Sequence, residues 1–274
     1  MKIRTFLAAR GMSAHRRFGQ NFLVNGTVRE RILDHLDILP GQTLWEVGPG
    51  LGAMTSGLLA RGAVVTAFEI DRGFIALLPA LFPEAHTASR LIIIPGDVLK
   101  TWKPALAAQQ APPSRLFGNL PYNIAATLIA NTITAGVRFD RCVFTVQKEV
   151  AQRMAAGPGT FASAFSVLCA WAYRVDPLFD LAPGNFWPRP KVSSTVVRLT
   201  PRSGFPGGTD PAHFARLVHG AFASRRKTIR NNLTILLGSP AAQAALAAAG
   251  IDGASRPEQI SVEGYTALAQ CVRL

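Results

Sequence analysis

The chain has 274 residues, of which 49% are hydrophobic and 16% are charged. This composition is typical of a globular protein with a sizeable core and excludes an intrinsically disordered chain. The 29 Lys and Arg outnumber the 16 Asp and Glu and give a net charge of +13. Such an excess favours RNA or DNA as the partner over an anionic membrane, with a merely basic soluble protein as the alternative.

The cysteines argue against a disulfide framework or a metal site. Cys142, Cys169 and Cys271 are widely spaced and odd in number, and no Cys/His ligand spacing is visible. A reducing, cytoplasmic location fits this usage, and we expect no metal. No apolar run approaches the roughly 18 residues of a membrane span, so we expect no membrane association.

The chain begins with a basic segment. Residues 1–20 contain five Lys or Arg and no acid, and their apolar part is too short for the core of a signal peptide. A mitochondrial transit peptide is one interpretation. We prefer a basic arm that contacts the substrate, with Arg16 and Arg17 as RNA-binding residues.

A short polar and apolar segment, residues 19–23, follows the arm. It precedes a predicted helix with Asn25 as N-cap and an apolar face that continues through Leu39 until Pro40 and Gly41 end it. The Gln–Asn pair beside Phe–Leu is able to cover a bound ligand. An ordinary loop without a ligand contact is the alternative.

The first unit of a nucleotide-binding α/β sheet follows. Residues 43–47 form a predicted strand, 48–52 a glycine turn, and a helix opens at Ala53. The G-x-G-x-G spacing does not match the G-x-G-x-x-G dinucleotide fingerprint. Glycines here let the backbone approach a ligand closely, and Glu46 before them is either structural or a direct contact.

Three further predicted strands each end in a polar or glycine-rich element. Residues 63–68 run into Glu69-Ile70-Asp71, 91–94 into Gly96-Asp97-Val98, and 115–117 into Asn119-Leu120-Pro121-Tyr122. Open α/β sheets bind ligands at these carboxyl ends, and an acid about 20 residues past a glycine turn takes ribose hydroxyls. The order predicts an adenosyl-cofactor site, with Asp97 on the adenine amine and Ile70 and Val98 sandwiching the ring.

The turn Asn119-Leu120-Pro121-Tyr122 suits a planar substrate that carries an amine. Pro121 has no N–H and disfavours a helical conformation at Leu120, which leaves that carbonyl free. The Asn119 oxygen and backbone carbonyls then lie beside the flat ring of Tyr122. An ordinary strand-to-helix turn is the alternative.

The remaining α/β elements complete a sheet. We predict helices over 123–135, 147–154 and 161–172, strands over 142–146, 175–181 and 194–199, and a loop at 157–159 able to flex. The loop at 183–192 is aromatic, basic and rich in proline, which lowers its conformational freedom and is able to hold Phe186 in place.

A linker at 200–209 predicts a boundary between a first domain, 1–201, and a helical domain, 210–274. Asp210-Pro211 and Ser239-Pro240 each pair a predicted N-cap with a proline at the first helical position, and Ser261 caps a last helix. The cations Arg225, Arg226, Lys227 and Arg230 favour a contact with the phosphate backbone over a solvated helix start.

Taken together, these motifs resemble the ribosomal RNA adenine dimethyltransferases, and most closely their small-subunit (KsgA-type) members. The similarity covers nearly the whole chain and lies in residues 19–23 (GQNFL), 46–52 (EVGPGLG), 69–71 (EID), 119–124 (NLPYNI), 186–194 (FWPRPKVSS) and 225–233 (RRKTIRNNL). Segment 157–172 departs from the family because it lacks the family's polar and tyrosine-bearing pattern and is richer in alanine. This departure puts helix boundaries and RNA contacts there in doubt but not the chemistry.

The resemblance implies a class I, Rossmann-like α/β methyltransferase. Its sheet is mostly parallel and seven-stranded with one antiparallel edge strand, followed by a small helical domain that contacts RNA. S-adenosylmethionine is the implied methyl donor. The implied reaction is dimethylation of the N6 amines of two adjacent adenosines near the 3′ end of small-subunit (16S) rRNA, on a pre-30S particle during ribosome biogenesis. We expect a monomer.

The resemblance also implies residue roles. Gln20, Asn21 and Leu23 line the cofactor pocket, Gly48 and Gly50 approach the methionine part, Glu69 holds the ribose hydroxyls, Asp97 meets the adenine, and Asn119 bridges cofactor and target. The chemistry of amine methylation adds further candidates. Asn119 and the carbonyl of Leu120 or Pro121 would accept the hydrogens of the target amine, and Tyr122 and Phe186 are the candidates for the two faces of a clamp on the base. Lys191 joins the RNA-binding residues.

Two alternatives remain open. One is a large-subunit (23S) rRNA adenine methyltransferase of the macrolide-resistance type. The helical tail and the sequence of residues 119–124 (NLPYNI) argue against it. The other is a non-catalytic nucleic-acid-binding factor on the same scaffold. Intact Glu69, Asp97 and Asn119 argue against lost chemistry.

Overall fold

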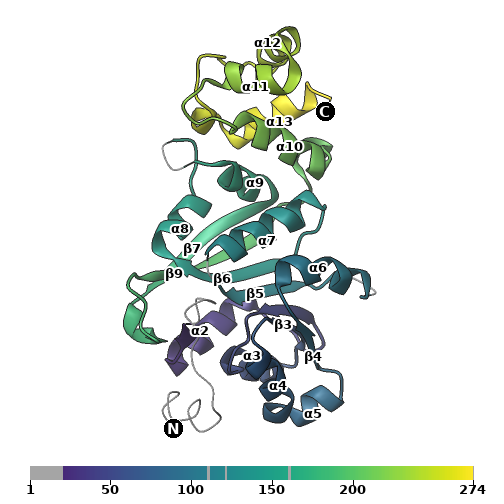
Figure 1. Ribbon diagram of the computed structural model, residues 1–274, viewed down its shortest axis with the longest axis vertical. Helices are drawn as coiled ribbons and strands as arrows, with labels where there is room; N and C mark the ends of the chain where they lie inside the picture. Colours follow the sequence, from purple (N-terminus) through teal and green to yellow (C-terminus); the bar gives the residue numbers. More distant parts are fainter. Residues whose placement is uncertain (1–20, 110–111, 121, 160–161, 274) are drawn as a thin grey trace. The chain divides into compact units, whose positions relative to one another are not determined.

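The computed structural model describes residues 21–109, 112–120, 122–159 and 162–273 (Figure 1). The chain divides into two compact units. One comprises Met1–Ala125, Phe139–Lys148 and Leu178–Arg198, and the other Ala126–Arg138, Glu149–Pro177 and Leu199–Leu274. The 200–209 linker lies wholly in the second unit, so this division does not follow it. The boundary at that linker stays a prediction.

A seven-stranded sheet has the strand order β4-β3-β2-β5-β6-β9-β7. It is mostly parallel with one antiparallel edge strand, and this confirms the predicted fold class. Its strands are β2 (Thr43–Val47), β3 (Val64–Glu69), β4 (Leu91–Pro95), β5 (Arg115–Asn119), β6 (Arg141–Gln147), β7 (Tyr173–Leu181) and β9 (Ser194–Pro201).

The register of the parallel strands determines where the candidate site lies. Val47 at the end of β2 pairs with Phe68 of β3 and with Gly118 of β5, and Glu69 pairs with Pro95 of β4. The carboxyl ends of these four strands therefore meet at one edge of the sheet, where open α/β sheets bind ligands.

Helices connect the strands and continue beyond them. Those of the α/β part are α2 (Gly26–Leu36), α3 (Ala53–Ala60), α4 (Arg72–Leu81), α5 (Pro83–Thr87), α6 (Val98–Ala107), α7 (Tyr122–Thr134), α8 (Lys148–Met154) and α9 (Ala164–Ala172). The later helices are α10 (Pro211–Ala221), α11 (Ile229–Leu237), α12 (Ser239–Ala248) and α13 (Val262–Gln270) (Figure 1). Short 3-10 turns occur at Pro183–Asn185, Pro206–Gly208 and Pro257–Gln259.

Helix α2 begins as predicted but ends early. The Asn25 side chain accepts a hydrogen bond from the Val28 amide, which confirms the N-cap. The helix stops at Leu36 because Asp37 takes a left-handed conformation with φ of 50°. Such a residue cannot continue a right-handed helix. The prediction that Leu39 lies on the buried face was wrong, since Leu39 is 59% exposed.

Two of the three N-caps predicted for the last helices are confirmed. Asp210 and Ser261 each accept a hydrogen bond from a backbone amide of the helix they open, as predicted. Ser239 is instead the first helical residue, and Gly238 is the N-cap. Gly238 also ends α11, with φ of 83°. One glycine thus serves both helices, which leaves no position for a serine cap.

The alanine-rich segment forms a buried helix of the second unit. Helix α9 begins after Ser163, which closes a capping box with Ser166, and the predicted start at residue 161 lies outside the described residues. Trp171 of α9 stacks on Phe205 and on Phe214, at 4.7 and 4.0 Å between ring centroids. Burial explains why this segment is apolar.

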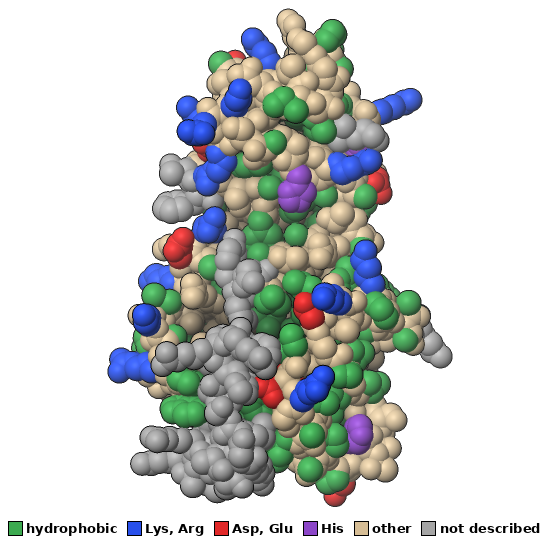
Figure 2. All heavy atoms as spheres, in the orientation of Figure 1, with side chains coloured by type: hydrophobic (Ala, Val, Ile, Leu, Met, Phe, Trp, Pro, Cys, Tyr) green, Lys and Arg blue, Asp and Glu red, His purple; other side chains and the backbone are tan. Residues whose placement is uncertain are grey.

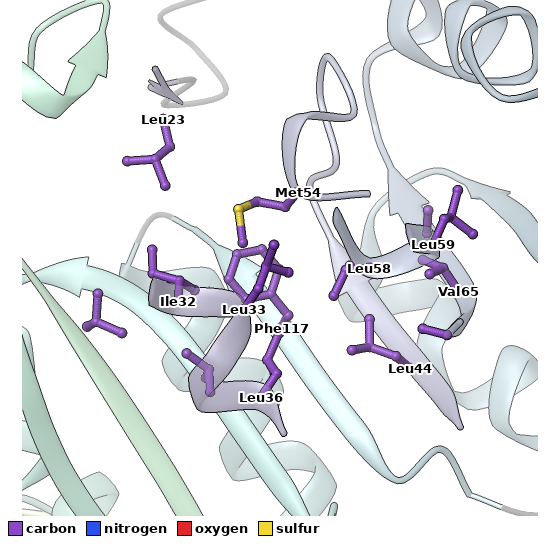
Figure 3. Close-up of a cluster of buried hydrophobic side chains, with 14 of the residues drawn as sticks. Leu23, Ile32, Leu33, Leu36, Leu44, Met54, Leu58, Leu59, Val65 and Phe117 are labelled. Carbon is purple, nitrogen blue, oxygen red and sulfur yellow. The ribbon is translucent and has the colours of Figure 1, made fainter. Parts of the chain in front are cut away.

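A hydrophobic cluster anchors the first turn of the site (Figure 3). Leucines of α2 and α3 pack with Leu44 of β2, Val65 of β3 and Phe117 of β5, and each fully buried side chain stabilises the fold by about 1.5–3 kcal/mol. A Cβ on Gly57 of α3 would overlap a methyl carbon of Leu33, so glycine allows the two helices to pack closely.

Candidate active site

The glycine turn after β2 has a backbone that disfavours side chains. Gly48, Gly50 and Gly52 have φ of 73°, 55° and 72°. L-residues adopt this left-handed region at a cost, which explains the glycines. A Cβ on Gly50 would lie 2.9 Å from the Phe22 ring, so residue type is restricted there by space as well as by conformation.

Glu69 connects the end of β3 to the glycine turn. Its Oε2 accepts a hydrogen bond from the Gly50 amide at 3.0 Å, and its Oε1 accepts from the amides of Ile70 and Asp71, each at 2.9 Å. Burial raises the pKa of this carboxyl, while the three backbone hydrogen bonds oppose the rise. A carboxylate has about four lone-pair sites, so it retains capacity for a further donor.

Glu46 is a second buried carboxyl beside the same turn. It is 1% exposed, and its Oε2 accepts a hydrogen bond from the Thr55 hydroxyl at 2.6 Å. Burial raises the pKa of Glu46 to about 8; the charge of Glu69 acts in the same direction, and the Thr55 hydrogen bond opposes it. Glu46 thus fixes α3 against β2.

The predicted adenine contacts lie at the ends of β3 and β4. Asp97 is the N-cap of α6, and its Oδ1 accepts a hydrogen bond from the Leu99 amide at 2.9 Å. The Gly96 amide donates to the Glu69 carbonyl at 2.7 Å, which ties the two strand ends together. Ile70 is 45% exposed and Val98 is buried at 5%.

Asn119 at the end of β5 is held by the N-terminal segment. Its Nδ2 donates to the Asn21 carbonyl at 2.8 Å. That bond uses the donor side of the amide and leaves its Oδ1 as an acceptor. The Leu120 side chain lies over the glycine turn, because a Cβ on Gly48 would lie 3.4 Å from a methyl carbon of Leu120. The sequence suggested a role only for the Leu120 carbonyl.

Some predicted site residues lie outside the described residues. These are Arg16, Arg17, Gln20 and Pro121. Tyr122 begins α7, but its side chain is also outside what the structure describes. Their predicted roles stay predictions.

A two-stranded sheet, which sequence analysis missed, brings the N-terminal segment to the aromatic loop. Strand β1 (Phe22–Leu23) pairs antiparallel with β8 (Phe186–Trp187), in the register Phe22 with Trp187 and Leu23 with Phe186. Two further hydrogen bonds extend the pairing: the Val24 amide donates to the Asn185 carbonyl at 2.9 Å, and Asn25 Nδ2 donates to Asn185 Oδ1 at 3.0 Å.

The same pairing buries two predicted site residues. Leu23 and Phe186 are 5% and 4% exposed and belong to one hydrophobic cluster with Leu181. Packing against Leu23 accounts for the position of Phe186. The role of the Phe186 ring as one face of a base clamp stays a prediction.

The predicted RNA-binding cations that the structure describes are exposed. Lys191 lies between β8 and β9, Arg225, Arg226 and Lys227 lie in the turn before α11, and Arg230 lies in the first turn of that helix. Basic side chains recur over the face shown in Figure 2. The geometry therefore leaves these cations accessible to a polyanion.

The described residues contain no group of three or more His, Cys, Asp or Glu able to hold a metal ion. Cys142 and Cys169 are buried, and Cys271 is exposed. Across the ranges given above, no helix is long and apolar enough to cross a membrane.

A family model described as "Ribosomal RNA adenine dimethylase" matches residues 11–273. The chain belongs to this family. The match extends from the basic arm to the last helix, so it includes every motif of the candidate site. Membership of this methyltransferase family confirms the resemblance that the sequence motifs indicated.

Curated relatives of the dimethylase family align over nearly their full length. Proteins named "Ribosomal RNA small subunit methyltransferase A" from Treponema pallidum (strain Nichols) and Magnetococcus marinus are 43% and 40% identical to the chain. Each alignment covers 98% of this chain, and it covers 94% and 95% of the two relatives.

Solved structures of similar fold include two transferases. A dimethyladenosine transferase from Plasmodium falciparum has a TM-score of 0.73 at 21% identity, covering 90% of this chain and 95% of that one. The 23S rRNA methyltransferase ErmE has a TM-score of 0.64 at 22% identity, covering 92% and 99%. These likenesses confirm the methyltransferase fold of the family member described here.

Proposed function

We propose that this protein transfers methyl groups from S-adenosylmethionine to the N6 amines of two adjacent adenosines near the 3′ end of small-subunit (16S) rRNA. The observation that supports this most is the meeting of Gly50, Glu69, Asp97 and Asn119 at one edge of the sheet. The names of the relatives at 40–43% identity support the choice of small-subunit RNA. The proposed setting is a pre-30S particle in the cytoplasm, with the enzyme as a monomer.

The residues at the glycine turn fit an adenosyl cofactor. The turn has no side chain at Gly48 or Gly50, which allows close approach of a ligand, and Glu69 retains acceptor capacity for ribose hydroxyls. Asp97 would meet the adenine amine, with Ile70 and Val98 on the ring faces. Gln20, Asn21 and Leu23 would cover the pocket. When bound, the cofactor supplies an activated methyl group on its sulfonium.

The chain's own groups then act on the target amine. An adenine amine is a weak nucleophile because its lone pair is delocalised into the ring. Asn119 Oδ1 and the carbonyl of Leu120 or Pro121 accept its hydrogens. These hydrogen bonds improve as the nitrogen becomes tetrahedral, so they stabilise the transition state more than the ground state. No strong general base is needed, since an alkylated nitrogen loses its proton readily.

The base must leave its stack to reach this site. Enzymes that modify bases hold the flipped base between aromatic or apolar faces, and each stacking contact is worth about 1–3 kcal/mol. Tyr122 and Phe186 are the proposed faces. Arg16, Arg17, Lys191 and the cations of residues 225–230 would hold the RNA through its phosphates.

The test uses Asn119→Ala with immature small subunits from a strain that lacks this methylation. We expect radiolabelled methyl transfer to fall about 100-fold or more, the effect of removing one such stabilising group, while RNA binding persists. Asn131→Ala, which removes an exposed amide from α7, is the control and should keep full activity. Full activity of Asn119→Ala would remove that residue from the mechanism.

The substrate used in the same assay distinguishes the remaining functions. Transfer to free large-subunit RNA, and not to the small-subunit particle, would indicate an enzyme of the macrolide-resistance type. Binding without transfer by the unmodified protein would indicate a non-catalytic RNA-binding factor.

A further inference from the structure

We propose that the indole of Trp187 is a stacking platform for an unpaired RNA base that flanks the methylated adenosines. Arg189 and Lys191, both exposed, follow it at alternate positions of the same loop and would contact the adjoining phosphates. This inference rests on the proposed function, because it takes RNA as the ligand.

Trp187 differs from every other tryptophan of the chain. Trp45, Trp102 and Trp171 are 0%, 1% and 0% exposed, whereas Trp187 is only partly buried. A large aromatic ring at the surface of a basic loop is a typical platform for single-stranded nucleic acid, since every base has a π-face to stack.

Contact with another aromatic ring fixes the plane of the Trp187 indole. Trp187 stacks on Phe22, with ring centroids 6.2 Å apart and planes at 17°. Phe22 meets the buried Phe74 edge to face, at 5.6 Å and 84°. The backbone pairing of Phe22 with Trp187 in β1 and β8 fixes the same relation. A ring held in this way loses little further freedom when a base stacks on it.

The position of Trp187 relates it to the reacting groups. Phe22, on which it rests, lies over Gly50, and the neighbouring Asn21 carbonyl holds the amide of Asn119. A base on Trp187 would therefore lie near the proposed target adenine and outside the pocket for the cofactor. This geometry assigns Trp187 to a neighbouring nucleotide.

Packing of Trp187 on Phe22 is the alternative explanation, and two substitutions separate it from stacking. Trp187→Phe keeps an aromatic face, whereas Trp187→Leu keeps apolar packing without one. The contribution of one stacked base corresponds to roughly a 5- to 150-fold change in affinity. We expect Trp187→Leu to weaken binding of a synthetic single-stranded RNA, carrying the 3′-terminal small-subunit sequence, within that range. Trp187→Phe should stay within about threefold of the unmodified protein, and cofactor binding should change in neither.

Fluorescence gives a second and independent test. The other three tryptophans are buried, so the iodide-quenchable emission should come from Trp187. We expect the RNA to quench this emission and to protect it from iodide in the unmodified protein and in the control Trp102→Phe, and no such response in Trp187→Phe. This measurement decides the inference even if Trp187→Leu does not fold.

The outcomes are distinct. Unchanged RNA affinity in Trp187→Leu, or an RNA response that persists in Trp187→Phe, would overturn the stacking platform. An equal loss of cofactor and RNA binding in Trp187→Leu would do the same, since it would show a packing role. If the unmodified protein transfers no methyl group to the particle, the proposed function fails, while quenching at Trp187 would still support an RNA-binding platform.

Discussion

Two buried carboxyls flank one glycine turn. Glu46 and Glu69 are 1% and 4% exposed, and within the described ranges neither forms an ion pair. Hydrogen bonds from Thr55 and from three backbone amides lower the cost of their burial, but burial still raises the pKa of both. An isolated buried carboxyl avoids its desolvation cost by staying protonated, so the free protein holds a proton at Glu46 near neutral pH.

The raised pKa of Glu46 predicts how stability depends on pH. The folded protein keeps the Glu46 proton up to about pH 8, whereas the unfolded chain releases it near the ordinary value of 4.5. Between these values the folded state binds more protons, so the free energy of unfolding falls as pH rises, by up to roughly 1.4 kcal/mol per pH unit for one such group. Burial raises the pKa of Glu69 as well, which adds to the slope in the same direction.

Glu46→Gln separates this contribution from other titrations. Glutamine keeps an oxygen for the Thr55 hydroxyl and cannot ionise. Denaturant unfolding of the cofactor-free protein at pH 5.5 and pH 8 should show a clear loss of stability in the unmodified protein and a smaller loss in the variant. Equal losses in the two proteins would show that Glu46 does not titrate over this range.

At the residue scale, the sequence predicted positions better than contacts. The acids at Glu69 and Asp97 and the amide at Asn119 follow strands that the apolar pattern reveals, so their place at the sheet edge was predictable. Their partners were not. The bond from Asn119 to Asn21 joins residues 98 positions apart, and no local pattern specifies such a contact.

At the element scale, the length of a helix or strand determined whether the sequence pattern could predict it. Buried strands of five or more residues and helices with caps produce periodic patterns. Strands β1 and β8 have two residues each, which is too short for any period, so their pairing was missed. This pairing brings Phe22 onto Gly50 and so makes the N-terminal segment part of the site.

That contact predicts a specific effect of a side chain at Gly50. Gly50→Ala would place a Cβ 2.9 Å from the Phe22 ring, so the ring, β1 or the turn must shift. Gly41→Ala is a matched control, because Gly41 also has a positive φ, 82°, but no atom lies within 4 Å of the added Cβ. Both substitutions should cost about 1–2 kcal/mol of backbone strain.

Calorimetry with S-adenosylmethionine separates the two glycine variants. We expect Gly50→Ala to bind it at least tenfold more weakly than Gly41→Ala, because only the former disturbs the segment that covers the proposed pocket. Equal affinities, with comparable losses in thermal stability, would show that the position of Phe22 does not affect the cofactor.

At the scale of the whole molecule, the net charge of +13 predicted a polyanionic partner but not where it binds. The structure adds that side-chain hydrogen bonds hold the backbone of the basic turn, residues 224–228. The buried amide of Asn232 accepts from the Ser224 amide at 3.1 Å and donates to the Ser224 carbonyl at 3.0 Å. Arg256 donates to the Arg225 carbonyl at 3.0 Å. Exposed cations on a fixed backbone suit a defined phosphate contact.

The salt dependence of RNA binding tests whether this turn makes located contacts. Each phosphate contact contributes about one unit to the slope of log affinity against log salt concentration. The double variant Arg226→Ala/Lys227→Ala should therefore reduce the slope by about two units and weaken binding to all RNA sequences alike. Methyl transfer at saturating particle concentration should stay unchanged, because these residues are proposed to contact phosphates and not the target amine.

A double variant with the same loss of charge provides the control. Arg61 is paired with Glu30 and Asp34, and Arg174 with Asp176, so neither is predicted to contact phosphate. Arg61→Ala/Arg174→Ala lowers the net charge by the same two units and should leave the salt slope nearly unchanged. If both double variants reduce the slope equally, RNA binding depends only on the overall charge of the protein, and residues 224–228 make no specific phosphate contact. A reduction confined to Arg226→Ala/Lys227→Ala would place phosphates on that turn.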